Sequence, residues 1–331
     1  MGTLRPFQLP QDIDLMVALV TEGFQYPENP DWNVQADERE GMADQISGIK
    51  RIWPLLRIMR VFVPLLHDVM RGFIYEEDGK PVGLINHMRQ RSAPEWHISN
   101  VTVLPACRRR GIARKLVEAA LAEIRARQAQ AAYLEVVTGN LPAYKLYEEL
   151  GFVSYTSTTQ YDLEDGPAIP SMPLPAGFDL LPIGPFDWKR RMAFALRITP
   201  PEILRYEPIR KDRFRPPFFV RILGPLISQI SGVKSKQFVA VTTQGETVAM
   251  GGYQYRTRPG GVNHLELNLD PAHPELAEPL ARQALSAIQK ASPDRRIEIH
   301  TRDWQPAVSQ AFEALGCKKR LSMYKMGLIF K

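Results

Sequence analysis

The sequence repeats one order of landmarks at a nearly constant spacing, and this repeat limits the chain to a duplicated architecture. The first landmark lies in a turn between two strand-like runs, the second ends a strand-like run, and the third ends a short helix-like run. The pairs are separated by 166, 166 and 165 residues and are Gly79 with Gly245, Pro105 with Pro271, and Gly151 with Gly316. A spacing held across several landmarks indicates duplication, not merely the alternation of helices and strands that any α/β chain shows.

A proline-rich stretch separates the two copies. Asp165–Gly177 contains four prolines and little periodic pattern, which is typical of a linker between domains. The sequence therefore predicts a first domain over residues 1–164, a linker over 165–177 and a second domain over 178–331.

Composition narrows the class of protein. Cys107 and Cys317 are too few and too far apart for a disulfide framework or a zinc ligand set, which favours a cytoplasmic location. Met1–Asp14 lacks the apolar stretch of a signal peptide, and Ile52–Met70 is interrupted by charged residues and falls short of the roughly 20 apolar residues of a membrane span. A formal net charge of +6 favours an anionic partner. We expect no membrane partner.

A basic loop follows the predicted strand Ile98–Val103. Apolar residues recur from Ile112 to Ile124 at helical spacing, so a helix is predicted to start at Gly111. A strand, a glycine-containing loop and a helix N-terminus together form an anion site, because free backbone N–H groups and the helix dipole both favour negative charge. The basic residues around it are Arg108, Arg109, Arg110, Arg114 and Lys115. Arginines alone would indicate a solvated face, but this position between strand and helix favours a ligand with several phosphates.

A second motif follows the predicted strand Tyr133–Thr138. Pro142 suits a first helical turn and Gly151 suits the residue after a helix, so a short helix is predicted between them. Two segments resemble the GNAT superfamily of acyl-CoA N-acyltransferases. Arg108-x-x-Gly111-x-Ala113 is similar to its pyrophosphate loop, Q/R-x-x-G-x-G/A. The element N-x-x-A-x-x-L-Y-x-x-x-G-F is matched at Asn140, Ala143, Leu146, Tyr147, Gly151 and Phe152.

This resemblance implies a fold and an activity. The fold would be α/β in the α+β sense, with two tandem GNAT-like domains that each have a mixed, mostly antiparallel sheet flanked by helices. The activity would be N-acetyl transfer from acetyl-CoA, or another acyl-CoA, to an amine by direct attack in a ternary complex, without a metal. The implied cofactor-binding residues are Val101 and Val103 by their backbone, and Arg108, Arg109, Arg110, Gly111, Ile112, Ala113, Arg114, Asn140, Ala143, Tyr144 and Tyr147.

The resemblance also implies a proton donor. Tyr147 would protonate the departing thiolate, which is chemically reasonable because a phenol with a pKa near 10 stays protonated at neutral pH. The alternative interpretation makes Tyr147 a core aromatic on the apolar face of its helix.

Three groups could receive the proton of the amine, and the sequence does not decide among them. Family members often carry a glutamate eleven residues before the first loop position, where this chain has His97. An imidazole serves at neutral pH, directly or through water. Glu95 shares the strand face if the strand extends that far. In the third option His97 is structural and bulk water accepts the proton.

The second copy has lost these motifs. Alignment by the repeat places Pro274, Ala277 and Pro279 where Arg108, Gly111 and Ala113 stand, and Phe312 where Tyr147 stands. Proline removes backbone donors, and phenylalanine has no proton to give. We expect the second domain neither to bind acyl-CoA nor to catalyse, but to support the first domain, complete the acceptor cleft or hold a homodimer.

Two further functions and the acceptor stay open. A noncatalytic acyl-CoA-binding or sensing protein would carry the same motifs. Nucleic-acid binding is disfavoured because no recognition module is evident. The acceptor is an amine of unknown identity. In the usual fold Gln35–Met70, with the aromatics Trp53 and Phe62 and with His67, and the preceding Trp32 would cover the acceptor side, but aromatics are more often core than pocket, so none receives a site role.

Overall fold

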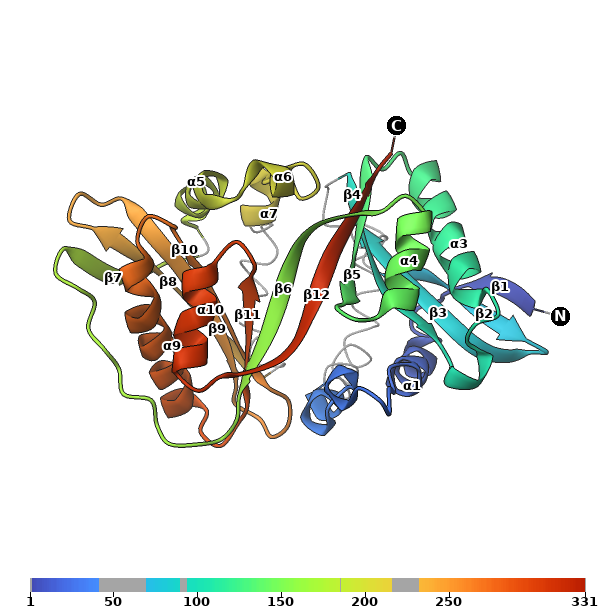
Figure 1. Cartoon of the computed structure of the whole chain (residues 1–331), viewed down its shortest axis with the longest axis horizontal. Coiled ribbons are helices and arrows are strands. Elements are labelled where there is room, and N and C mark those ends of the chain that lie inside the picture. The colour runs from blue at the N-terminus through green and yellow to red at the C-terminus, as the bar shows by residue number, and fades with distance from the viewer. Residues whose placement is uncertain (1, 42–69, 90–93, 185, 216–231, 331) are drawn as a thin grey trace. The chain divides into compact units, whose positions relative to one another are not determined.

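The structure is a computed structural model that describes residues 2–41, 70–89, 94–184, 186–215 and 232–330. The chain divides into two compact units (Figure 1). Unit 1 comprises Met1–Tyr155 with Tyr324–Lys331, and unit 2 comprises Thr156–Met323.

Unit 1 is a mixed sheet with helices on both faces. Its strand order is β1-β2-β3-β4-β5-β12; the pairs from β1 to β4 are antiparallel, and β4 and β5 are parallel. Its elements are β1 (Gly2–Pro6), α1 (Ile13–Gly23), η1 (Pro30–Trp32), β2 (Arg71–Glu77), β3 (Lys80–Arg89), β4 (Glu95–Val103), η3 (Pro105–Cys107), α3 (Ile112–Ala126), β5 (Ala131–Val137), α4 (Leu141–Glu149) and the second part of β12 (Lys318–Ile329).

The main core of unit 1 lies between the sheet and the helices α3 and α4 (Figure 1). Helix α3 forms because its apolar residues recur on one face, and six of its side chains are buried. At roughly 1.5–3 kcal/mol for each large apolar side chain, this burial accounts for the fixed position of α3. On the other face α1 packs against β3 and β4 through a smaller cluster that includes Leu19 and Leu84.

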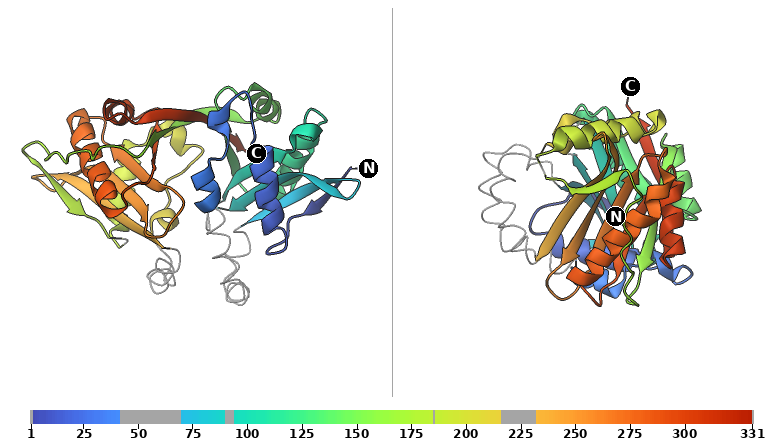
Figure 2. Two further views of the ribbon diagram at one scale, coloured as in Figure 1. Left: turned by 90° about the horizontal axis from the view of Figure 1, so that it is seen from below. Right: turned by 90° about the vertical axis from the view of Figure 1, so that its left-hand side faces the viewer.

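Unit 2 repeats this arrangement. Its strand order is β12-β6-β11-β10-β9-β8-β7; β10 and β11 are parallel, and the pairs β6–β11, β10–β9, β9–β8 and β8–β7 are antiparallel. Its elements are β6 (Val153–Leu163), β7 (Phe178–Pro182), α5 (Trp188–Ile198), α6 (Pro201–Leu204), α7 (Lys211–Phe214), β8 (Val233–Thr242), β9 (Thr247–Arg256), β10 (Asn263–Leu269), η4 (Pro274–Leu276), α9 (Ala277–Ala291), β11 (Ile297–Arg302), α10 (Pro306–Ala314) and the first part of β12. Figure 2 shows α9 and α10 along one face of these strands, where they enclose the core of this unit.

The predicted fold class is confirmed, since each unit has a mixed, mostly antiparallel sheet flanked by helices. Both hairpins form as predicted. Asp78 and Gly79 join β2 to β3 with φ of 49° and 76°, and Gly245 takes φ of 82° between β8 and β9. These left-handed turns suit the twist of the flanking strands.

The bounds of the units differ from the predicted bounds 1–164, 165–177 and 178–331. Residues 156–163 of β6 pair with β11 inside unit 2, whereas the end of β12 lies beside β5 in unit 1, where the Phe330 N–H donates to the Gln130 carbonyl (2.9 Å). The proline-rich stretch Asp165–Gly177 is therefore internal to unit 2. The two closing strands are exchanged relative to their order in the sequence, a long-range pairing that local sequence patterns do not encode.

Candidate active site

Strand β4 changes its neighbours along its length. Its parallel pairing with β5 covers Glu95–His97, while its pairing with β3 continues to Val103. A register shift opposite Leu84 and Asn86 coincides with a left-handed φ of 51° at Asn100, which marks a bulge in β4. Within the described residues the two parallel strands thus diverge after His97. The backbone of Val101 and Val103 lies in this divergent part, where an extended ligand can pair with a strand edge.

The loop after β4 carries two left-handed residues. Arg109 has φ of 65° and Gly111 has φ of 75°, and Gly111 is the N-cap of α3. Such a loop turns successive N–H groups toward one side and forms a concave anion site in front of a helix N-terminus. A Cβ placed on Gly111 would meet nothing within 4 Å, so the space over this residue is open. Ile112 is buried and Ala113 half-buried, so both offer backbone groups to a ligand and not side chains.

The basic side chains of the loop do not all converge on this space. Arg110 forms an ion pair with Glu77 (Nη1 to Oε2, 2.8 Å), and Arg114 forms one with Glu149. Arg109 is exposed and has no ion-pair partner in the described part of the chain. Among Arg109, Arg110 and Arg114, Arg109 is therefore the one that could bind a phosphate without breaking an ion pair.

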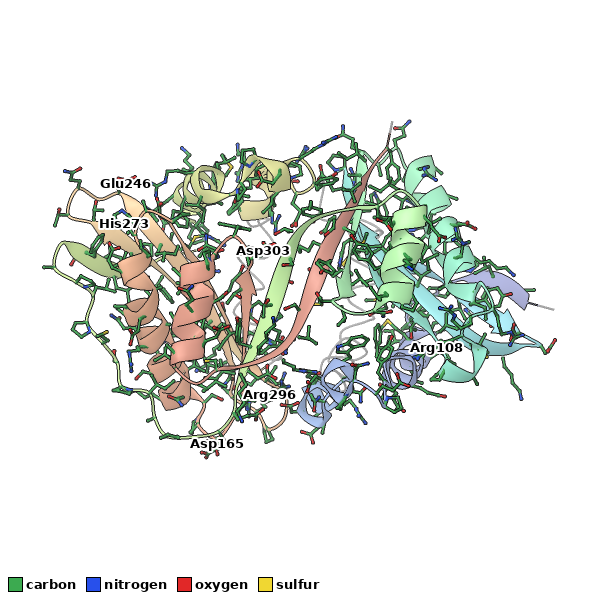
Figure 3. The ribbon with its side chains drawn as sticks, viewed as in Figure 1. Arg108, Asp165, Glu246, His273, Arg296 and Asp303 are labelled. Carbon is green, nitrogen blue, oxygen red and sulfur yellow. The ribbon has the colours of Figure 1, made fainter. Side chains whose placement is uncertain are left out.

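Arg108 has a different role from the one expected for its side chain. Its Nη2 donates to the Gly23 carbonyl at the end of α1 (2.8 Å), its Nε donates to the Val103 carbonyl (3.3 Å), and the guanidinium stacks on Tyr26 at 4.8 Å from the ring centre. Figure 3 shows Arg108 beside α1. These carbonyl groups hold the guanidinium at the end of α1. The role of Arg108 in phosphate binding, through its side chain or its backbone, stays a prediction.

Tyr147 lies on α4 and is 5% exposed. Its ring packs edge to face against Phe152, with 6.0 Å between ring centres, within the core under α3. Burial, with a smaller contribution from Tyr26, raises the pKa of Tyr147. The phenol is thus held protonated at neutral pH, as a proton donor must be, while the ring is also a core aromatic.

The two candidate bases lie together on β4. The strand does extend to Glu95, so Glu95 and His97 share the face opposite Trp96 and Ile98, which belong to the core under α3. Glu95 is buried, and the half-buried His97 ring stacks on Tyr133 with 4.9 Å between ring centres.

The start of α4 fixes the remaining predicted residues. The Asn140 side-chain oxygen accepts the Ala143 N–H (3.3 Å), so Asn140 caps this helix. Its amide nitrogen and the second lone pair of its oxygen could still make the cofactor contact that the resemblance implies. Tyr144 packs edge to face against Tyr324, with 5.5 Å between ring centres.

Comparisons with known proteins bear on this geometry. Residues 46–152 match the model of the acetyltransferase (GNAT) family. The match covers about a third of the chain, so this segment is similar to the GNAT family. The similarity supports acyl transfer as the general chemistry of unit 1.

Solved structures extend the similarity in fold to the whole chain. A tandem GNAT protein from the clavulanic acid biosynthesis pathway matches with a TM-score of 0.64 and 15% identity, over 99% of this chain and 98% of that one. A GCN5-related N-acetyltransferase from Sphaerobacter thermophilus matches with a TM-score of 0.65 and 13% identity, over 99% and 95%. A putative acetyltransferase from Pyrococcus horikoshii matches with a TM-score of 0.59 and 16% identity, over 100% and 90%. No curated protein matches in a sequence search. The tandem GNAT architecture is thus a shared fold at low sequence identity.

The second GNAT fold lacks the loop that the first one has. In unit 2 the 3-10 helix Pro274–Leu276 runs directly into α9, and Ala277 has a right-handed φ of −58°. The left-handed turn is therefore absent at this position, and no nest of N–H groups forms there. Phe312 is fully buried where Tyr147 stands in unit 1.

In unit 2 a side chain covers the backbone at the end of strand β10. The Gln305 side chain accepts the Leu269 N–H (3.0 Å) and donates to the Leu269 carbonyl (2.9 Å), and Gln305 is 5% exposed. Leu269 and Gln305 are the repeat partners of Val103 and Asn140. A side-chain amide thus pairs with the backbone that a ligand would use in the GNAT fold.

The sequence missed Tyr26 and Gln305. Tyr26 packs against Trp32 (5.3 Å between ring centres) and under Arg108, and it contributes to the electrostatic environment of Tyr147. Nothing local in the sequence signals these contacts, although the repeat spacing does point to Gln305. Trp53, Phe62 and His67 lie outside the described residues. Of the described helices, none has the length and apolar character to cross a membrane.

Proposed function

We propose that this chain is an N-acyltransferase that uses acetyl-CoA, or another acyl-CoA, and an amine acceptor at unit 1. The observation that carries the proposal is the open, left-handed turn at Gly111 before α3, next to the divergent part of β4. The N–H groups of this turn would bind the pyrophosphate, and the Val101–Val103 backbone would pair with the pantetheine amides.

In this proposal the amine attacks the thioester directly, and Tyr147 protonates the departing thiolate. The proton that the amine loses goes to Glu95 or His97, directly or through water. Burial raises the pKa of Tyr147, so its hydroxyl is protonated at neutral pH and holds the proton that would pass to the departing thiolate. Unit 2 would carry no second cofactor, since the left-handed turn is absent at Ala277 and, in addition, Gln305 occupies the Leu269 backbone.

A panel of amines with acetyl-CoA, followed by release of the free thiol, tests the proposal. Turnover of at least one amine is expected, and acetyl-CoA binding without any turnover would favour the noncatalytic alternative. The acceptor, the predicted cytoplasmic location and the homodimer stay predictions.

Tyr147→Phe sharpens this test because it keeps the ring and its packing. Loss of general-acid catalysis lowers kcat by about 100-fold or more, with little change in acetyl-CoA affinity. Tyr253→Phe is the matched control, since Tyr253 is also a buried tyrosine, in unit 2. An unchanged kcat for Tyr147→Phe, where chemistry limits the rate, would show that Tyr147 only packs.

A further inference from the structure

Unit 2 carries a cluster of metal-ligating side chains that the acyl-transfer site does not use. His264 lies on β10, and Glu298 and His300 lie on β11. One ligand atom from each lies within 4.8 Å of the other two. We propose that these three residues bind a divalent transition-metal ion, with Zn²⁺ as the expected ion.

The strand register creates this cluster. β10 and β11 are parallel, and His264 lies opposite Glu298 in the register. His300 follows Glu298 by two residues, so all three side chains share one face. The alternate residues Leu265, Ile297 and Ile299 are buried in the core on the other face, under α9 and α10 (Figure 2). The buried residues fix the strands and therefore the positions from which the ligands project.

The distances suit a small coordination sphere. The Nε2 atom of His300 lies 2.6 Å from Oε1 of Glu298, and Nδ1 of His264 lies 3.8 Å from the same oxygen. In a tetrahedral zinc site with bonds of 2.0–2.1 Å, ligand atoms are about 3.3 Å apart. The two separations lie on either side of this value, and all pairs lie within 4.8 Å, so small side-chain rotations would be expected to complete the site.

The ligand types favour zinc over calcium or magnesium. Two imidazoles and one carboxylate match late first-row ions, whereas Ca²⁺ and Mg²⁺ take oxygen ligands. Three protein ligands leave a fourth position for water. The side chain of Glu298 is 12% exposed, while those of His264 and His300 are 47% and 40% exposed, so an ion can enter from solvent.

Neighbouring charges on this face have partners of their own. Arg302 pairs with Glu266 (2.7 Å), and Asp162, opposite Glu298 on β6, pairs with Arg296. Arg320 also lies 3.8 Å from the Asp162 carboxylate, so both of these acidic neighbours already have basic partners. No metal was expected from the sequence, in which zinc ligands were sought among the cysteines. This cluster was not detected there, because His264 and His300 are too far apart in the sequence to form a short motif.

Equilibrium competition between the tag-free protein and a chromophoric zinc chelator tests the proposal. One Zn²⁺ per chain is expected, with a rise in the unfolding temperature. His264→Ala and His300→Ala should each weaken binding by at least tenfold, and Glu298→Gln, which keeps the side-chain shape, should do the same. His273→Ala, at a half-buried histidine of the same unit, and Cys107→Ser are the controls and should bind as the parent does.

Two results would overturn the proposal. One is less than half an equivalent of Zn²⁺ per folded chain, which would make the cluster a hydrogen-bonded surface network. The other is unchanged stoichiometry and affinity in the double variant His264→Ala with His300→Ala, which would place the ion elsewhere. This test is independent of acyl transfer.

Discussion

Replacing Gly111 with alanine separates the cost of the left-handed turn from its use in binding phosphate. Gly111 has φ of 75° and an open space over its Cα, so the added methyl group meets no protein atom within 4 Å. The only expected cost to the folded chain is the left-handed conformation itself, about 1–2 kcal/mol. For a unit of this size the unfolding temperature should fall by about 2–8 °C.

Acetyl-CoA affinity should fall far more than this strain explains. The methyl group occupies the space into which a phosphate would approach the backbone, so at least one charge-assisted hydrogen bond is lost. Such bonds contribute about 1.5–3 kcal/mol, which corresponds to a Kd about 10- to 100-fold weaker. Isothermal titration calorimetry with acetyl-CoA measures this change directly.

Gly245→Ala is the matched control. Gly245 has φ of 82°, and a Cβ there also meets nothing within 4 Å, but it lies in the β8–β9 turn of unit 2. Its strain should equal that of Gly111→Ala, with an unchanged Kd. Normal binding by Gly111→Ala, or equal weakening in both variants, would refute the assignment of this turn to phosphate.

Three further predictions follow from side-chain partners. Gln305→Ala should lower the free energy of unfolding of unit 2 by about 1–3 kcal/mol, measured in urea, because it leaves the buried Leu269 backbone unpaired. Calorimetry should still find one acetyl-CoA per chain. Two sites per chain would contradict the conclusion that unit 2 cannot bind phosphate without a left-handed turn at Ala277. Arg108→Ala should lower the unfolding temperature by several degrees, because its hydrogen bonds to two carbonyl groups are lost. Arg109→Ala should leave the unfolding temperature unchanged but weaken acetyl-CoA binding in a salt-dependent way. The reverse pattern would contradict the separate roles of the two arginines. The hydrogen bond from His87, followed by that from Arg71, lowers the pKa of Glu123 to about 2, so the stability that this carboxylate contributes is present above about pH 4.5 and is lost as pH falls toward 2. Glu123→Gln should lower the free energy of unfolding by roughly 1 kcal/mol at pH 6, after allowance for the partial exposure of the side chain. A loss that does not change with pH would show that the charge of Glu123 does not contribute to stability.

Local sequence predicted the parts of the site that local chemistry determines. A helix starting at Gly111 and a short helix between Pro142 and Gly151 were predicted. The structure has α3 from Ile112 and α4 from Leu141, close to these positions, because helix ends depend on a few neighbouring residues. The side-chain position of Arg108 could not be predicted, since its partner Gly23 is 85 residues away in the sequence.

The same limit explains why the compact units differ from the predicted domain bounds. The repeat gave the order of elements in each copy, but strand pairing depends on which edges meet in three dimensions. β6 pairs with β11 and β12 lies beside β5, and neither strand carries a local signal for its partner. Only the repeat, which aligns Gln305 with Asn140, could have indicated that the two units differ at this position.

The exchanged closing strand sets an order of events during translation. Met326, which is fully buried in the core of unit 1, lies beyond the whole of Thr156–Met323 in the sequence. A ribosome that adds about 5–20 residues per second needs on the order of ten to thirty seconds to make that intervening segment. For that time the first unit, although its earlier strands have left the ribosome, waits with part of its apolar core uncovered. Chains that stall within unit 2 would therefore expose an incomplete unit 1 to chaperones and proteases.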